Sequence, residues 1–275
     1  MRGNKIIYPA MPLNIPLRKK ILAGEPAAGG WLTLPSTAIA RTIASTNNVS
    51  WVLIDGEHGL INESHFYDLA NVIAASGASP LVRVPAEEAW LIKRALDSGA
   101  HGLMVPMANS AEIVHKVVQA TKYPPHGIRG YGPMFTHATG QLGGSYKESA
   151  NEDLLIAVQI EHPNAVKEIE DIVKEDIDIA FIGPFDLAVS MGIEFGGVEH
   201  EAAISKILDA CKKAGKAAAI FCLTGEQAAK RFAQGFDMVS VTTDIDTLTD
   251  GFAAALQAAT GQSNAFTAAG SGYSL

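Results

Sequence analysis

The chain has 275 residues, 48% of them hydrophobic, so it can bury a full core, and a barrel of this length is routinely a single domain. The 29 acidic residues outnumber the 21 basic ones and no basic stripe is present, which argues against nucleic acid as a partner. No run of eighteen apolar residues and no apolar signal core are present, so we expect a cytoplasmic protein that contacts no membrane. Cys211 and Cys222 lack metal-site spacing and are expected to be buried, reduced thiols.

Eight short apolar runs alternate with helix-like stretches along the chain. After a proline-rich arm at residues 1–15, a short amphipathic helix at residues 17–24 is expected to close the bottom of a barrel. Strands are predicted at residues 30–34, 51–55, 81–84, 102–105, 155–160, 179–182, 217–222 and 238–241. Helical patterns include residues 64–76, 89–98, 110–121, 164–174, 202–214 and 225–234, and several end at a glycine in the C′ position.

This alternation predicts parallel strands joined by right-handed crossovers. The strands are near-continuous apolar runs, which is typical of a sheet buried on both faces. We therefore expect an α/β fold, a (β/α)8 TIM barrel, as one domain over residues 16–259. An open doubly wound sheet stays an alternative, although no Gly-x-Gly-x-x-Gly element follows a strand. Residues 123–153 are predicted to form a long functional or mobile loop, and residues 260–275 a flexible tail.

Polar residues collect at the carboxyl ends of the predicted strands, where a (β/α) barrel keeps its active site. Glu161 ends the fifth run and Asp186 follows the sixth, so the two carboxylates are expected to lie near each other and to suit Mg²⁺ or Mn²⁺. Gln159 shares the face of Glu161 because it lies two residues earlier in a strand. The alternative is that both acids are solvated loop residues.

The second and third strand ends carry further candidate residues. A lone histidine is more often structural than catalytic, but His58 lies at a strand end beside Asp55 and Glu57, which favours a base with supporting acids. Arg83 interrupts an apolar run, and a buried cation there must meet an anion, such as a carboxylate or a developing enolate oxygen. None of the fourteen lysines lies within a predicted strand, so metal stabilisation of a carbanion is favoured over a Schiff base.

Six motifs together carry a family resemblance. They are Asp55-Gly-Glu-His58, Val82-Arg83-Val-Pro, Leu91-Ile-Lys-Arg-Ala-Leu-Asp97-Ser-Gly, Tyr123-Pro-Pro-His-Gly-Ile-Arg-Gly130, Gln159-Ile-Glu161 and Phe181-Ile-Gly-Pro-Phe-Asp186-Leu. In this order they closely resemble the HpcH/HpaI family, the class II aldolases of 4-hydroxy-2-oxoheptanedioate and 2-dehydro-3-deoxyglucarate. The likeness covers nearly all of the chain from residue 16 to about residue 258.

The resemblance implies a role for each matching residue. His58 would be the general base, Asp97 would raise its basicity, and Arg83 would stabilise the enolate. From the sequence alone, Asp97 reads as a surface acid of a helix. For the ligands, the resemblance implies a divalent metal (Mg²⁺ or Mn²⁺, with Co²⁺ as a further candidate) on Glu161 and Asp186, a pyruvyl contact from Gln159, and a carboxylate site at the backbone of Gly183, Phe185 and Asp186.

The resemblance also implies an assembly, a homo-hexamer built from dimers that exchange their last helix. The apolar pattern Phe252-Ala-Ala-Ala-Leu256 gives this chain a helix that could pack on a neighbour.

The chain departs from the family pattern in three places. It has Pro85-Ala-Glu-Glu where many members have Trp-Asn-Asp, it has Phe185 where a small residue is common, and residues 132–143 lack an Ala-Arg-Ala-Ser pattern. These changes leave the second substrate open.

We expect a metal-dependent aldolase that converts a 4-hydroxy-2-oxo acid to pyruvate and an aldehyde through a metal-stabilised enolate. One alternative is an oxaloacetate decarboxylase or macrophomate synthase-like enzyme with the same enolate site. Another is a non-catalytic barrel, which the six intact motifs argue against.

Overall fold

The computed structural model describes residues 12–139 and 146–261. The predicted arm at residues 1–15 is described from residue 12 onward, and the predicted tail at residues 260–275 only as far as residue 261; the rest of both lies outside the described residues.

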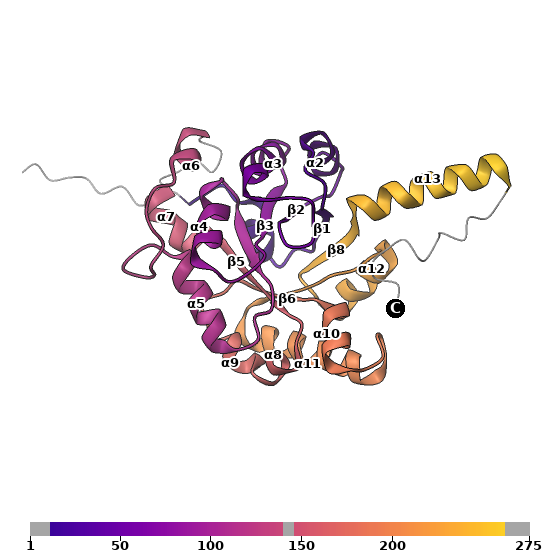
Figure 1. The fold of residues 1–275 in the computed structure, drawn as a ribbon. Helices are drawn as coiled ribbons and strands as arrows, with labels where there is room; N and C mark the ends of the chain where they lie inside the picture. The colour runs from indigo at the N-terminus through magenta and orange to yellow at the C-terminus, as the bar shows by residue number, and fades with distance from the viewer. Residues whose placement is uncertain (1–11, 140–145, 262–275) are drawn as a thin grey trace, which may run out of the picture.

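Eight parallel strands form a closed barrel in chain order, with the last strand paired to the first (Figure 1). They are β1 (Ala27–Leu32), β2 (Trp51–Asp55), β3 (Ser79–Arg83), β4 (Gly102–Val105), β5 (Leu155–Ile160), β6 (Ile179–Ile182), β7 (Ala217–Ile220) and β8 (Met238–Thr243). The predicted (β/α)8 barrel is confirmed, and the open sheet is excluded because β1 and β8 close the ring.

Thirteen helices occur in the described residues. They are α1 (Pro16–Leu22), α2 (Thr37–Ala44), α3 (Glu63–Ala75), α4 (Ala89–Asp97), α5 (Ala111–Thr121), α6 (Met134–Thr139), α7 (Tyr146–Asp153), α8 (Pro163–Lys167), α9 (Ile169–Ile172), α10 (Pro184–Met191), α11 (Val198–Ala214), α12 (Gly225–Gln234) and α13 (Asp244–Thr260). The helix predicted at residues 164–174 is thus divided into α8 and α9. The described part of the chain contains no helix that is long and apolar enough to span a membrane.

Helix α1 closes the bottom of the barrel, as predicted. The backbone N–H of Leu17 donates to Ser79 Oγ at 3.0 Å, and Ser79 is the first residue of β3. Leu17 is fully buried, and Arg18 pairs with Asp178 at 2.8 Å between Arg18 Nη1 and Asp178 Oδ1. The two cysteines, Cys211 and Cys222, are free and buried, as expected.

Strand β1 begins three residues earlier than predicted. The prediction began too late because the first residues of the strand are small rather than β-branched, and small residues give little strand signal. Gly29 pairs with Trp51 of β2, and a Cβ atom on Gly29 would lie 2.3 Å from that residue. Glycine is therefore required for the fully buried indole of Trp51 to lie inside the barrel, where it meets the rings of Trp31 and Phe181.

The segment predicted as a long loop contains α6 and α7. It leads from the end of α5 to the start of β5, so it lies at the bottom of the barrel, where helices end and strands begin. Arg129 is buried there, with its guanidinium 4.6 Å from the ring centroid of Tyr123. Arg129 also pairs with Asp97 at the end of α4, so this part of the segment packs against the helices that surround the barrel. Residues 140–145 lie outside the described residues.

The last helix, α13, extends away from the barrel (yellow in Figure 1). Asp244, at its first residue, is buried and accepts hydrogen bonds from the backbone N–H groups of Thr33 and Leu34. Beyond this anchor the helix is exposed: Phe252 is 69% and Leu256 51% accessible to solvent. An apolar cavity of about 340 Å³ lies between α2 and the first turns of α13.

Candidate active site

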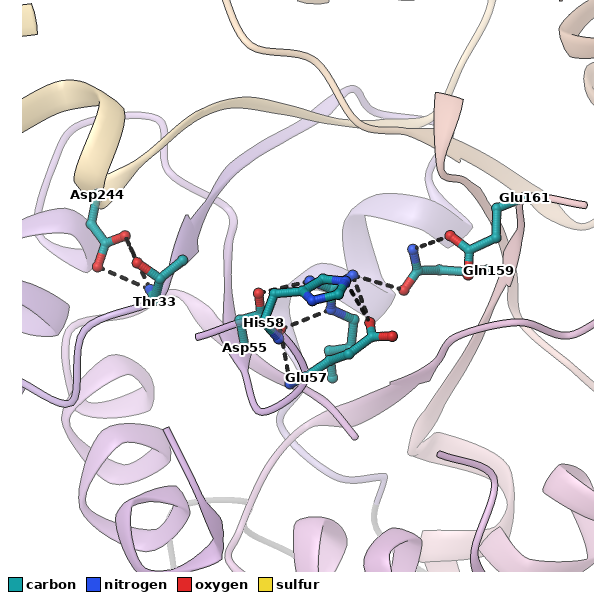
Figure 2. A network of polar contacts seen from close by, with 8 residues as sticks. Thr33, Asp55, Glu57, His58, Gln159, Glu161 and Asp244 are labelled. Atoms are coloured by element: carbon teal, nitrogen blue, oxygen red, sulfur yellow. Dashed lines mark hydrogen bonds and ion pairs between the residues drawn. The ribbon is translucent and has the colours of Figure 1, made fainter. Parts of the chain in front are cut away.

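Charged and amide side chains form one connected network at the carboxyl ends of the strands (Figure 2). Asp55 is the last residue of β2 and Arg83 the last residue of β3, and the strand register places them side by side. Glu161 directly follows β5, and Asp186 lies in the first turn of α10.

Arg83 lies at the centre of this network. Its Nε donates to Asp55 Oδ1 at 2.8 Å and its Nη2 to Asp55 Oδ2 at 2.7 Å, a two-pronged pair between buried groups. Its Nη1 lies 2.9 Å from Glu57 Oε2 and 3.3 Å from Gln159 Oε1. The guanidinium also lies 5.4 Å from the ring centroid of Trp31.

The pairing with Arg83 fixes the charge of Asp55. Burial alone would raise the pKa of Asp55, but the hydrogen bond and the positive charge of Arg83 bring the pKa below its usual value. The pKa of Glu57 is raised instead, first by burial and then by the nearby charges of Asp55 and Asp186. The site therefore holds more acidic groups than its one arginine neutralises.

The pKa of Glu161, another buried acid of this network, is also raised. Burial, helped by the charges of Asp186 and Glu57, raises the pKa of Glu161 to about 7, although the N–H of Met107 opposes the shift. Its Oε1 accepts that N–H at 2.7 Å and its Oε2 accepts Gln159 Nε2 at 2.8 Å. A buried carboxylate in this state requires a proton or a cation.

The residues present fit a hard divalent cation. Glu161 and Asp186 would supply the carboxylate oxygens, and a cation between them would compensate the charge excess. Within residues 12–139 and 146–261, no three His, Cys, Asp or Glu side chains are grouped so that they alone could hold an ion. The remaining ligands would be water and substrate oxygens, which is usual for Mg²⁺.

Gly183, between β6 and α10, makes room for this carboxylate. A Cβ atom at residue 183 would lie 2.3 Å from Glu161 Oε2 and 3.3 Å from Gln159 Nε2. A larger residue at position 183 would force the Glu161 carboxylate to move, whereas the backbone conformation itself, with φ of −89°, does not favour glycine.

His58 lies at the rim of the network, and its side chain is 62% exposed. Its Nε2 is 3.9 Å from Glu57 Oε2, and its backbone N–H donates to Asp55 Oδ1 at 3.3 Å. It therefore lies where a side chain can meet both the network and a molecule that enters from solvent.

Asp97 is not brought to His58 within this chain. It is the last residue of α4, and a helix of this barrel ends at the bottom, opposite the strand ends that carry His58. Its Oδ1 accepts Arg129 Nη2 at 2.6 Å. Asp97 could reach a His58 side chain only across a contact between two chains.

A cleft of about 280 Å³, mouth included, opens beside the network. The enclosed part of this space is only about 20 Å³. The lining residues are Trp31, Arg83, Gln159, Phe181, Gly183, Pro184, Phe185, Asp186 and Phe221. Sequence reasoning missed Trp31 and Phe221, which stand at the ends of the first and seventh strands; their place at strand ends was the available signal.

A family model described as HpcH/HpaI aldolase/citrate lyase matches residues 28–250. The chain is 38% identical over 234 residues to a hydroxypyruvate/pyruvate aldolase from Agrobacterium fabrum, covering 82% of this chain and 86% of the relative. It is 35% identical over 237 residues to a 2-keto-3-deoxy-L-rhamnonate aldolase from Klebsiella pneumoniae, covering 84% and 88%. Among solved structures, an HpcH/HpaI aldolase/citrate lyase family protein from Burkholderia cenocepacia matches with a TM-score of 0.82 and 31% identity, over 90% of this chain and 99% of that one.

Proposed function

The chain belongs to the HpcH/HpaI aldolase/citrate lyase family and is a carbon–carbon lyase, and we propose that it is a divalent-metal-dependent aldolase that cleaves a 4-hydroxy-2-oxo acid to pyruvate and an aldehyde. The observation that supports this proposal is the state of Glu161, which is buried near Asp186 and requires a proton or a cation. Gln159 links Glu161 to Arg83, because it forms a hydrogen bond with each of them. Relatives named as aldolases of pyruvate or of a 2-keto acid support the substrate class.

The substrate's carboxylate and oxo group are the parts that this site would bind. Helix α10 begins at Pro184, and the N–H groups at the start of a helix point outward along its axis, which suits a carboxylate there. Gln159 lies beside this helix start and offers an amide to the same end of the substrate. A divalent cation on Glu161 and Asp186 would polarise the oxo group and stabilise enolate charge.

The cleavage itself needs a base and a positive charge from the chain. His58 takes the proton of the 4-hydroxyl; the C3–C4 bond breaks, the aldehyde leaves, and the electron pair of that bond forms the C2–C3 double bond of the enolate. Arg83, held in orientation by Asp55, places its guanidinium toward the developing negative oxygen. A proton then returns to C3 and completes pyruvate.

Two further residues, Asp97 and Glu57, would support the base and the arginine. Asp97 would raise the basicity of His58 only from a second chain, because it lies at the opposite end of its own barrel. Glu57, which contacts Arg83 and lies beside His58, would support both residues from within the chain.

The experiment is a product analysis. The protein is incubated with Mg²⁺ or Mn²⁺ and a panel of 4-hydroxy-2-oxo acids, and separately with oxaloacetate, while pyruvate, aldehyde and carbon dioxide are each quantified. We expect pyruvate and aldehyde in equal amounts from at least one hydroxy acid. Pyruvate that appears only with carbon dioxide would replace the proposed aldolase by an oxaloacetate decarboxylase.

A further inference from the structure

Three aromatic side chains in contact with one another form a wall of the cleft beside its polar residues. Phe221 meets Trp31 edge to face, with ring centroids 4.9 Å apart and planes at 83°. Phe185 meets Phe221 in the same manner, at 6.1 Å and 72°. Trp31, Phe185 and Phe221 all line the cleft, and they come from β1, the first turn of α10 and the segment after β7.

The ring of Phe185 is held from behind by a second phenylalanine. Phe195, in the connection between α10 and α11, stacks on Phe185 with centroids 4.4 Å apart and planes at 8°. Phe195 does not line the cleft itself. The stack therefore fixes the rotamer of Phe185 without adding a group that would contact a ligand.

His200 ties the two phenylalanine segments together. It is fully buried on α11, and its Nδ1 accepts the N–H of Gly196 at 3.0 Å. Because that nitrogen is an acceptor, the proton is on Nε2, which donates to the carbonyl oxygen of Pro184 at 2.8 Å. The residue before Phe185 and the residue after Phe195 are thus joined through one side chain.

We propose that Phe185 limits the size of the 2-oxo acid donor, by closing the space next to carbon 3, and that Phe195 and His200 are positioning residues for it. The inference rests on the proposed function. Arg83, Gln159 and Asp186 are the polar residues of the cleft, so the carboxylate and oxo groups of a donor would turn toward them and carbon 3 toward the aromatic side chains. A donor with hydrogens alone on carbon 3 fits; a methyl or ethyl substituent meets the Phe185 ring.

The test follows enolate formation, which needs no aldehyde. In D₂O with Mg²⁺, a C3–H proton leaves to a base, its electron pair forms the enolate, and a deuteron returns to C3; NMR measures this exchange for pyruvate, 2-oxobutanoate and 2-oxopentanoate. We expect Phe185→Ala to raise the rate of the longer donors relative to pyruvate by about tenfold or more, since one methylene in a pocket is worth about that factor. Phe185→Leu should give a smaller rise.

Phe195→Ala tests the positioning claim, because it removes the support of the Phe185 ring without changing a residue of the cleft. It should raise the same ratio, whereas a merely structural role would lower all donors together. Phe135→Ala is the matched control: Phe135 is 57% exposed and packs on Tyr67, at 5.1 Å between centroids. It should leave the ratio unchanged.

An unchanged ratio in a folded, active Phe185→Ala or Phe185→Leu protein would overturn the inference. Aldol cleavage by the wild type is measured in parallel. If exchange occurs and the ratio shifts but no aldehyde is released from any hydroxy acid, the proposed aldol step fails and the donor-size inference stands. If the wild type exchanges none of the donors, the inference fails with it.

Discussion

Arg83 shows how far a single residue can be interpreted from the sequence. A cation inside an apolar strand implied an anionic partner, and Asp55 and Glu57 provide it. The identity of the partners followed from no pattern, because it depends on the register of β2 against β3. Asp97 shows the converse: its motif matches the family, yet its ion pair with Arg129 could be found only from the fold.

His58 is assigned as the base, and its replacement should separate two reactions. Cleavage of the hydroxy acid requires loss of the 4-hydroxyl proton, so His58→Ala should lower that rate by about a hundredfold or more. Any decarboxylation of oxaloacetate should suffer less, because it requires no such proton transfer. Both rates are measured on the same preparation. Equal losses would show that His58 holds the site together and is not the base.

Glu161 should make the metal-free protein less stable as pH rises. Its pKa is raised from 4.5 to about 7, so the folded state favours its neutral form. The stability that the neutral form contributes is fully present below pH 4.5 and is lost as the pH rises through 7. Glu161→Gln should remove this pH dependence, which at pH 8 amounts to at most about 3 kcal/mol in the free energy of unfolding. Denaturant unfolding in chelator at pH 5 and pH 8 measures it. Parallel pH profiles for the two proteins would contradict the assignment.

At the scale of elements, the sequence located the eight strands because each buried run is continuously apolar. It placed the start of β1 too late, since Ala27, Ala28 and Gly29 have no strand preference; at Gly29 the close approach of Trp51 selects the small residue. Helix α10 was also missed. The family resemblance implies a carboxylate site at the backbone of Gly183, Phe185 and Asp186, but that these residues begin a helix appears only in the structure.

The junction of β6 and α10 gives a prediction at this scale. Gly183→Ala should displace Glu161, because the new methyl group would lie 2.3 Å from its Oε2, and should weaken activation by Mn²⁺ about tenfold or more, as for other groups that orient metal ligands. Gly225→Ala is the control: Gly225 also begins a helix, and a Cβ atom there meets nothing within 4 Å. Equal metal titrations for both variants would show that Glu161 is not confined by Gly183.

For the whole molecule, α13 and the cavity beside it indicate a partner. The helix leaves Ile245, Leu248, Phe252 and Leu256 exposed by 39% to 69%. The apolar cavity between α2 and α13 is lined by residues such as Ile39, Ile43 and Leu248. An exposed apolar helix beside an apolar cavity is typical of a surface that is covered in an assembly.

We therefore predict a homo-oligomer, a hexamer from the family resemblance, with α13 in the contact between chains. Phe252→Asp should shift the population toward smaller species, because it places a charge in that contact. Light scattering at micromolar concentration measures the mass, and Val198→Asp, at a position 89% exposed on α11, serves as the comparison. A wild-type monomer would reject the assembly, and with it any role of Asp97 toward His58.

We propose that a divalent cation on Glu161 and Asp186 enables this barrel to form a pyruvate enolate. The most direct measurement is the rate of cleavage of a 4-hydroxy-2-oxo acid by a preparation shown by elemental analysis to be free of metal, before and after addition of Mg²⁺ or Mn²⁺. We predict no cleavage without metal, recovery when metal is added, and no recovery in folded Glu161→Ala or Asp186→Ala protein. Full turnover by the verified metal-free protein would contradict it.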